Sequence, residues 1–142
     1  MNTGKSRQLP QGGDPLIDWI FNALILLLKH VKIYKVRGLK DPGDNTVLDG
    51  YMVDLGDSWE IYLDARSNDP LELILIHELA HALFCDVISD DEDLISNLET
   101  VLWDKFTENQ KSFLKSFMPK RVSKKKPKKL SYDFKFTFSD DK

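Results

Sequence analysis

The sequence predicts an α+β domain with an N-terminal helix, a small three-stranded and mostly antiparallel sheet, and after the sheet two longer helices and a final short one. Three observations lead to this prediction: helix-start signals, apolar residues at spacings of three and four, and short alternating segments. The chain has 142 residues, of which 42% are hydrophobic and 30% charged. These values are typical of one globular domain and exclude a disordered or fibrous protein.

The first element is expected to be a helix from Pro15 to about His30. Asp14 is a favoured N-cap residue, and proline is favoured at the first helical position. Apolar residues from Leu16 to Val31 recur at spacings of three and four, as in an amphipathic helix. The apolar stretch is shorter than the ~20 residues that span a bilayer. It also fits a signal peptide poorly, so we expect a cytoplasmic protein without a membrane segment.

Three strands are expected next, over residues 31–36, 47–55 and 59–64. A polar loop at 41–45 separates the first two strands. Only residues 56–58 separate the second from the third, so these two should form a hairpin. Side chains alternate along a strand, and therefore Ile61 and Leu63 should share one face while Tyr62 lies on the other.

A buried helix should follow the sheet. Asp69 and Pro70 repeat the helix-start signal, and apolar residues from Leu71 to Phe84 surround the helix on nearly all sides. A helix that is apolar all round belongs in the core of a domain.

Two more helices complete the predicted domain. The first is expected to be capped by Ser89 or Asp90 and to reach about Lys105. The second is a short helix around 113–117, closed by Pro119. The predicted domain therefore spans residues 14–118, between a disordered N-terminus (1–13) and a basic tail (119–142).

The buried helix carries the segment His77-Glu78-Leu79-Ala80-His81. Histidines four residues apart project from one helical face, so both imidazoles can reach one metal ion. Glu78 points beside that position, where it can take a proton from a metal-bound water; this is the HExxH pattern of zinc hydrolases. The alternative is two core-facing histidines beside an ion-paired glutamate. Three titratable groups in so apolar a helix are costly without a metal, which disfavours that alternative.

A third metal ligand is needed, and the best candidates are acids in the following helix. Glu92 and Glu99 are seven residues apart and lie on nearly one face. Spacing alone slightly favours Glu99, because it lies deeper in the helix, whereas Glu92 can complete a capping box with Ser89. His30 precedes the sheet and is a poor candidate. The single cysteine, Cys85, excludes a cysteine-ligated zinc site.

The segment at about 47–109 resembles the small ImmA/IrrE-type metallopeptidases, which are gluzincins common in phages and mobile elements. The likeness lies in three segments, Ile61–Asp64, Leu73–Leu83 and Glu92–Leu98. It implies a minimal zincin-like domain with one Zn²⁺ ion. By resemblance the third ligand is Glu92, with Glu99 as the alternate, because position 99 is usually small in the family.

The resemblance and the motif together predict a zinc-dependent peptidase in which His77, His81 and Glu92 hold the metal and Glu78 is the general base. The expected substrate is a protein or peptide, paired along the strand at 59–64. Tyr51 or Tyr62 could assist the oxyanion.

The charge is divided unevenly along the chain. The net charge is −3, which excludes a strongly basic protein, but residues 1–119 carry −9 and residues 120–142 carry +6. Five of the tail's charges could contact the phosphates of nucleic acid: Lys124, Lys125, Lys126, Lys128 and Lys129. A solvated, flexible tether is the favoured explanation of this lysine run, and nucleic-acid contact is the alternative.

Aromatic residues alternate with polar ones over 132–138, in the pattern of a strand. This strand could pair with a partner, with a second copy of the chain to form an oligomer, or with its own domain. The alternative function is therefore a nucleic-acid-associated or partner-binding protein with a structural or regulatory metal site.

Overall fold

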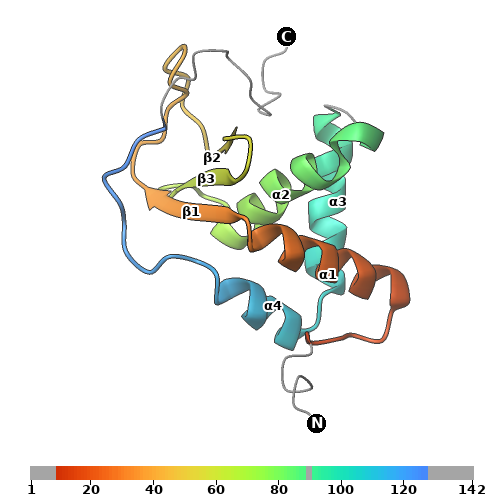
Figure 1. The fold of residues 1–142 in the computed structure, drawn as a ribbon. Coiled ribbons are helices and arrows are strands. Elements are labelled where there is room, and N and C mark those ends of the chain that lie inside the picture. The colour runs from red at the N-terminus through yellow and green to blue at the C-terminus, as the bar shows by residue number, and fades with distance from the viewer. Residues whose placement is uncertain (1–8, 89–90, 128–142) are drawn as a thin grey trace.

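The sheet consists of β1 (Val31–Val36), β2 (Gly50–Asp54) and β3 (Trp59–Asp64), in the order β1-β3-β2. The computed structural model describes residues 9–88 and 91–127 (Figure 1). The α+β class is confirmed, and β2 and β3 form the expected antiparallel hairpin. β1 pairs parallel to β3, so the sheet is mixed. The connection at 37–49 joins β1, at one edge of the sheet, to β2 at the opposite edge, and β3 lies between them.

Four helices are seen in the described part of the chain: α1 (Pro15–Leu28), α2 (Leu71–Ile88), α3 (Glu92–Lys105) and α4 (Glu108–Lys115). The Asp14 side chain accepts hydrogen bonds from the backbone N–H groups of Leu16 and Ile17, which confirms it as the cap of α1. None of these helices is both long and apolar enough to cross a bilayer.

The caps of the last two helices differ from the prediction. Asp91 caps α3 by accepting from Leu94 N, so the helix begins later than a cap at Ser89 or Asp90 implied. α4 begins at Glu108, earlier than predicted, because Thr107 and Gln110 form a capping box.

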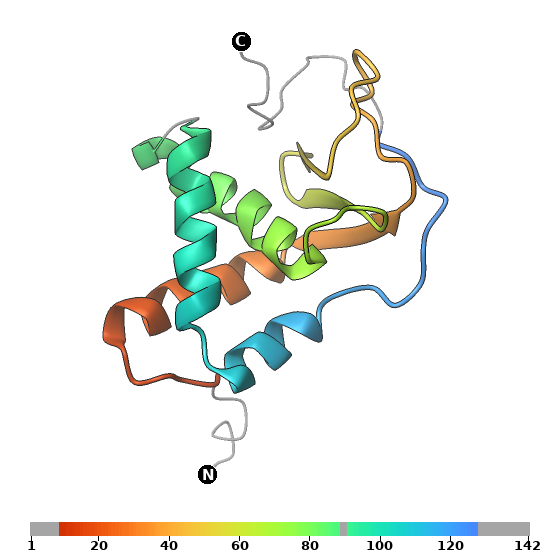
Figure 2. The same cartoon turned by 180° about the vertical axis from the view of Figure 1, so that it is seen from behind.

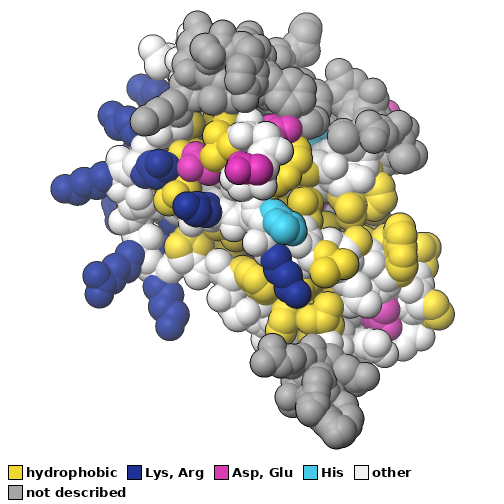
Figure 3. Space-filling view, in the orientation of Figure 1, with side chains coloured by type: hydrophobic (Ala, Val, Ile, Leu, Met, Phe, Trp, Pro, Cys, Tyr) yellow, Lys and Arg dark blue, Asp and Glu magenta, His cyan; other side chains and the backbone are white. Residues whose placement is uncertain are grey.

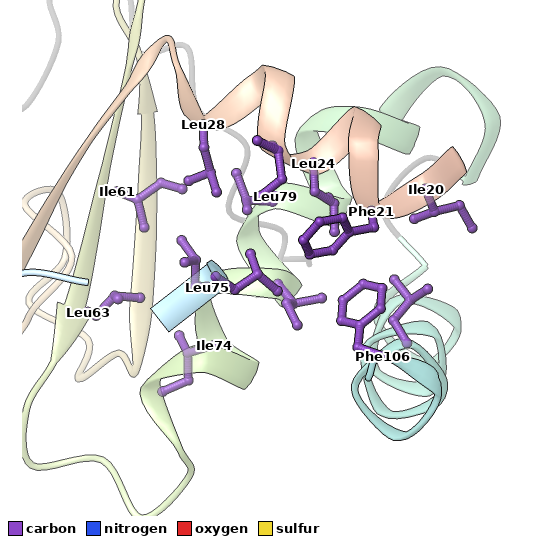
Figure 4. Packing of buried hydrophobic residues seen from close by; sticks show 14 of the residues in the cluster. Ile20, Phe21, Leu24, Leu28, Ile61, Leu63, Ile74, Leu75, Leu79 and Phe106 are labelled. Carbon is purple, nitrogen blue, oxygen red and sulfur yellow. The ribbon is translucent and has the colours of Figure 1, made fainter. Parts of the chain in front are cut away.

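The main core lies between one face of the sheet and the helices. Ile61 and Leu63 of β3 meet Leu75 and Leu79 of α2, and Phe21 of α1 lies deeper between the helices (Figure 4). Tyr62 lies in a smaller cluster on the other face, which confirms the predicted alternation. α2 is thereby fixed against the sheet, and its position places the site described below.

Residues 9–13, expected as part of a disordered N-terminus, contact the helices. Leu9 packs against the main core, and the backbone N–H groups of Gly12 and Gly13 donate to the Asp18 carboxylate. Gln110 of α4 is fully buried and donates to both the Pro10 carbonyl and Asp18. These bonds tie the chain ahead of α1 to α4.

The first part of the basic tail runs from α4 to the loop that follows β1 (Figures 1 and 2). Val122 forms a parallel bridge with Lys35 of β1, and Ser123 N donates to the Lys35 carbonyl at 2.6 Å. This portion is therefore held against the sheet and is not the solvated tether that was expected. Lys128, Lys129 and the expected strand at 132–138 lie outside the described residues.

Candidate metal centre

A pocket of about 420 Å³ opens between α2, α3 and the start of β2. The side chains lining it are Leu48, Asp49, Asp69, Ile74, His77, Glu78, His81, Glu92, Ser96 and Glu99, together with the backbone of Gly50. Five of these residues are acidic, and no lysine or arginine is among them. The pocket is therefore suited to a cation, and both HExxH histidines reach it.

Three of the predicted ligands converge in this pocket. Their ligand atoms all lie within 4.8 Å of one another, and the group formed by His77, His81 and Glu92 could hold a metal ion. The two histidine Nε2 atoms are 3.2 Å apart, and the Glu92 oxygens lie 2.9 Å from His77 Nε2 and 3.1 Å from His81 Nε2.

These separations match a zinc ligand set. Two ligand atoms at about 2.0–2.1 Å from Zn²⁺ at a tetrahedral angle lie about 3.3 Å apart. The three observed separations are each within half an ångström of that value. Helical spacing explains the two histidines, because α2 is regular at both, and its one non-helical residue, Phe84, comes after His81.

Glu92 and Glu99 contact different atoms of His77. The Nε2 atom faces Glu92, whereas the Nδ1 atom is hydrogen-bonded to Glu99 Oε1. A metal-binding histidine usually donates its second N–H to a carboxylate, which fixes the tautomer and the ring orientation. The geometry therefore separates the two candidates: Glu92 stands at the ligand position and Glu99 at the orienting position.

The same carboxylates change the titration of His77. Burial disfavours its charged form, but the hydrogen bond that His77 donates to Glu99 and the charges of Glu78, Glu99 and Glu92 outweigh burial and raise the pKa of His77 to about 9. Without a metal, the imidazolium balances part of the pocket's negative charge.

Glu78 is buried beside the two histidines and is 7% exposed. Its Oε1 atom has no hydrogen-bond partner among the described residues. Burial, helped by the charges of Glu92 and Glu99 and opposed by His77, raises the pKa of Glu78 to about 7. A buried carboxylate without a partner is costly, and it is often found where a proton must be accepted.

Gly50 is a site residue that the sequence did not reveal. A Cβ atom there would lie 2.6 Å from Ile74 Cγ2 and 3.1 Å from Glu78 Oε2. Only a residue without a side chain lets β2 approach α2 this closely. A glycine at the start of a strand is a weak signal of such an approach. Asp49, Asp69 and Ser96 also line the pocket, and no motif marked them.

The two predicted tyrosines do not reach the pocket. Tyr51 and Tyr62 are buried in the cluster on the face of the sheet opposite α2, because residues that alternate with Met52, Ile61 and Leu63 must point away from the helix. The Tyr62 hydroxyl donates to Glu60 at 2.8 Å, and burial raises its pKa. Neither tyrosine can therefore assist an oxyanion in the pocket that holds His77, His81 and Glu92.

The strand that was predicted to pair with a substrate, β3, does not lie at an edge of the sheet. β3 lies between β1 and β2, so its backbone groups are already paired on both sides. In the described part of the chain, the strand that reaches the pocket is β2, through Gly50 and the preceding Asp49. β2 is an edge strand, and its outer side pairs with no named strand there.

The remaining predicted residues lie elsewhere. His30 is exposed just after α1, as expected of a residue that is not a ligand. Lys124, Lys125 and Lys126 line a different hollow from the metal pocket.

No protein-family model matches the chain, and neither the curated protein sequences nor the solved structures contain a match to it.

Proposed function

We propose that this protein is a zinc-dependent metallopeptidase that hydrolyses peptide bonds of a protein or peptide substrate. One observation carries the proposal: Glu78, buried and with one oxygen unpartnered among the described residues, lies beside a converging group of two histidines and a glutamate. Two imidazoles and one carboxylate are a catalytic zinc ligand set, which leaves a fourth position for water.

The donor atoms support zinc as the metal. His77 and His81 would bind through Nε2 and Glu92 through a carboxylate oxygen, the atoms that converge in the pocket. When bound, Zn²⁺ lowers the pKa of a coordinated water and polarises a carbonyl oxygen. Glu99 holds His77 by its Nδ1 atom, so that Nε2 stays directed at the ligand position.

Glu78 has the properties of a general base. Its carboxylate accepts a proton from the attacking water and then donates it to the leaving nitrogen of the peptide. A pKa near 7 suits both steps, because the group must accept and release a proton at the same pH. The burial that raises this pKa also limits competing contacts with solvent.

We assign substrate alignment to β2. An extended peptide can add to the outer edge of this strand by main-chain hydrogen bonds. Gly50 at the start of β2 lines the same pocket as Glu78, and a Cβ atom at position 50 would lie 3.1 Å from Glu78 Oε2, so a peptide paired there passes close to the general base. This replaces the strand at 59–64 as the substrate-binding edge.

The test combines metal analysis with a peptide-cleavage assay. The protein is loaded with Zn²⁺, its zinc content is measured, and a mixture of unstructured peptides is incubated with it and read by mass spectrometry. Wild type should bind one zinc ion per chain and cleave peptides. Glu78→Gln should keep the zinc and lose at least about 100-fold in cleavage rate. Glu72→Gln, in the first turn of the same helix, is the matched control and should cleave like wild type.

Two results would count against the proposal. Lack of stoichiometric zinc in the wild type would remove the metal chemistry. Zinc binding that raises the melting temperature, with no cleavage that depends on Glu78, would favour the alternative of a structural or regulatory metal site in a partner-binding protein.

A further inference from the structure

A second hollow, of about 730 Å³, lies between the loop after β1 and residues 122–127. Its lining includes five basic residues, Arg37, Lys40, Lys124, Lys125 and Lys126, which we call the basic groove. All five are exposed. In Figure 3, lysine and arginine side chains gather on one flank of the molecule, where Figure 1 shows this loop and the tail.

The tail side of the groove is held in place by β1. Ser123 N donates to the Lys35 carbonyl at 2.6 Å, and Lys35 Nζ donates to the Lys120 carbonyl at 3.2 Å. Lys125 lies 5.3 Å from the centre of the Tyr34 ring and 3.9 Å from the Glu60 carboxylate. Backbone and side-chain contacts thus position the three consecutive lysines.

The loop side is held by a buried carboxylate. Asp64 accepts hydrogen bonds from Leu39 N at 3.0 Å and Gly38 N at 3.4 Å, the two residues between Arg37 and Lys40. Gly38 has a φ of 71°, which glycine adopts without strain. Cations separated widely in the sequence are therefore presented together by two fixed segments.

Two carboxylates lie near these five cations: Glu60, 3.9 Å from Lys125 Nζ, and one acid in the lining itself. The acidic residue in the lining is Asp41, which is 6% exposed and accepts from Gly43 N at 2.7 Å. Residues 1–119 as a whole carry a net charge of −9, so a polyanion is repelled from much of the remaining surface. The charge distribution therefore favours this flank as the place where a polyanion binds.

We propose that the basic groove binds the phosphodiester backbone of nucleic acid without reading its sequence. Duplex DNA carries one negative charge per ~1.7 Å of helix axis, a continuous line of charge that suits a row of lysines facing two more cations. Lysine binds phosphate as a point charge. Among the described residues, no aromatic side chain on which a base could stack lines the groove, so its contacts there are to the phosphodiester backbone. This function is independent of the metal site.

The test measures binding of the full chain to a fluorescein-labelled 20-bp duplex and to a second duplex of scrambled sequence. Fluorescence anisotropy is recorded between 50 and 200 mM salt. Both duplexes should bind equally, and the slope of log K against log salt should be about −4 for four to five phosphates. Lys124→Gln/Lys125→Gln/Lys126→Gln should reduce the slope by about 3, and Arg37→Gln/Lys40→Gln by about 2. Lys105→Gln/Lys115→Gln is the matched control and should bind like wild type.

Two further variants separate a held groove from a loose basic tail. Ser123→Pro removes the N–H that bonds Lys35 and keeps every charge, so it should weaken binding. Ser123→Ala keeps that N–H and loses only the hydroxyl that accepts from Lys125 N, so it should weaken binding less than Ser123→Pro. Circular dichroism checks that each variant is folded.

Three outcomes would overturn the proposal. Unchanged binding by Arg37→Gln/Lys40→Gln would mean that the tail alone binds. An equal effect of the Lys105/Lys115 control would mean nonspecific attraction to any lysine. Binding of a glutamate-rich peptide in place of the duplex would identify the groove as a surface for acidic proteins.

Discussion

The metal pocket and the basic groove carry opposite charge and are assembled by different routes. The pocket takes its three converging groups from α2 and α3, two helices that follow one another in the chain. The groove joins segments that lie far apart in the sequence: Lys35 and Lys120, which are hydrogen-bonded, are 85 positions apart. A site made by helical spacing can be recognised in a sequence, whereas a site made by docking of a distant segment cannot.

The difference also concerns what supports each charged group. In the pocket, the histidines and glutamates contact one another, so loss of one changes the titration and orientation of the rest. In the groove, the cations are separately anchored through the backbone of their own segments. We therefore expect strongly coupled effects of substitutions in the pocket and nearly additive effects in the groove.

The largest predicted effect concerns the two glutamates of α3. Glu99→Gln should weaken zinc binding about 10–100-fold, because it removes the carboxylate that orients His77. Glu92→Ala should weaken it further, because it removes a ligand. Zinc affinity is measured by competition with a chromophoric chelator, and duplex binding serves as the control, which neither variant should change. The reverse order of effects would make Glu99 the third ligand.

A smaller effect is expected from Asp64, which supports the loop side of the groove. Asp64→Ala leaves the N–H groups of Leu39, Gly38 and Arg66 without their acceptor, and should lower the free energy of unfolding by about 2–3 kcal/mol. Urea unfolding measures this loss. Duplex affinity should fall and zinc affinity should not, so an equal loss of both would show that the two regions are not independent.

Gly50→Ala tests the approach of β2 to α2. The new methyl group would overlap Ile74, so we expect a loss of about 1–2 kcal/mol in stability and a slower peptidase reaction at unchanged zinc content. Removing the obstructing atoms in Gly50→Ala/Ile74→Ala should recover part of the lost activity. If the single variant cleaves peptides like wild type, the β2 backbone has no role in placing the substrate.

The smallest effect lies outside both regions, at Asp18. Hydrogen bonds, first from Gly12 N and then from Gln110 and Gly13 N, outweigh burial and lower the pKa of this carboxyl. Its contribution to stability is therefore present above the unfolded pKa of about 3.8 and is lost as the pH falls through the lower folded value. In Asp18→Asn the melting temperature should fall less steeply than in wild type as the pH is lowered below about 4, while zinc and duplex binding remain unchanged. A melting temperature that falls as steeply as that of wild type below about pH 4 would contradict this role of Asp18.

Local sequence signals were sufficient for several parts of the fold. Asp14 and Pro15 marked the start of α1, and the alternation over 59–64 marked β3 with its bounds and its faces. These features depend on neighbours within a few residues. The histidine pair was recognisable for the same reason, since four residues of helix bring both rings to one side.

Other features depend on how elements pack and could not be read locally. Spacing along the sequence slightly favoured Glu99 over Glu92 as a ligand. Which of the two faces the ligand position depends on the rotation of α3 about its own axis, and the core contacts of α3 set that rotation. The pairing of β1 with β3 depends on the path of the connection at 37–49. The position of Tyr51 and Tyr62 followed from the alternation already seen, once α2 was known to cover the other face.

The bridge between Lys35 and Val122 has a consequence for solubility. An uncovered strand edge offers unpaired backbone groups to other chains and promotes aggregation. Because the Ser123 N–H occupies the Lys35 carbonyl, the basic tail shields the β1 edge at this point. A chain truncated after Pro119 should therefore self-associate even with its metal pocket intact.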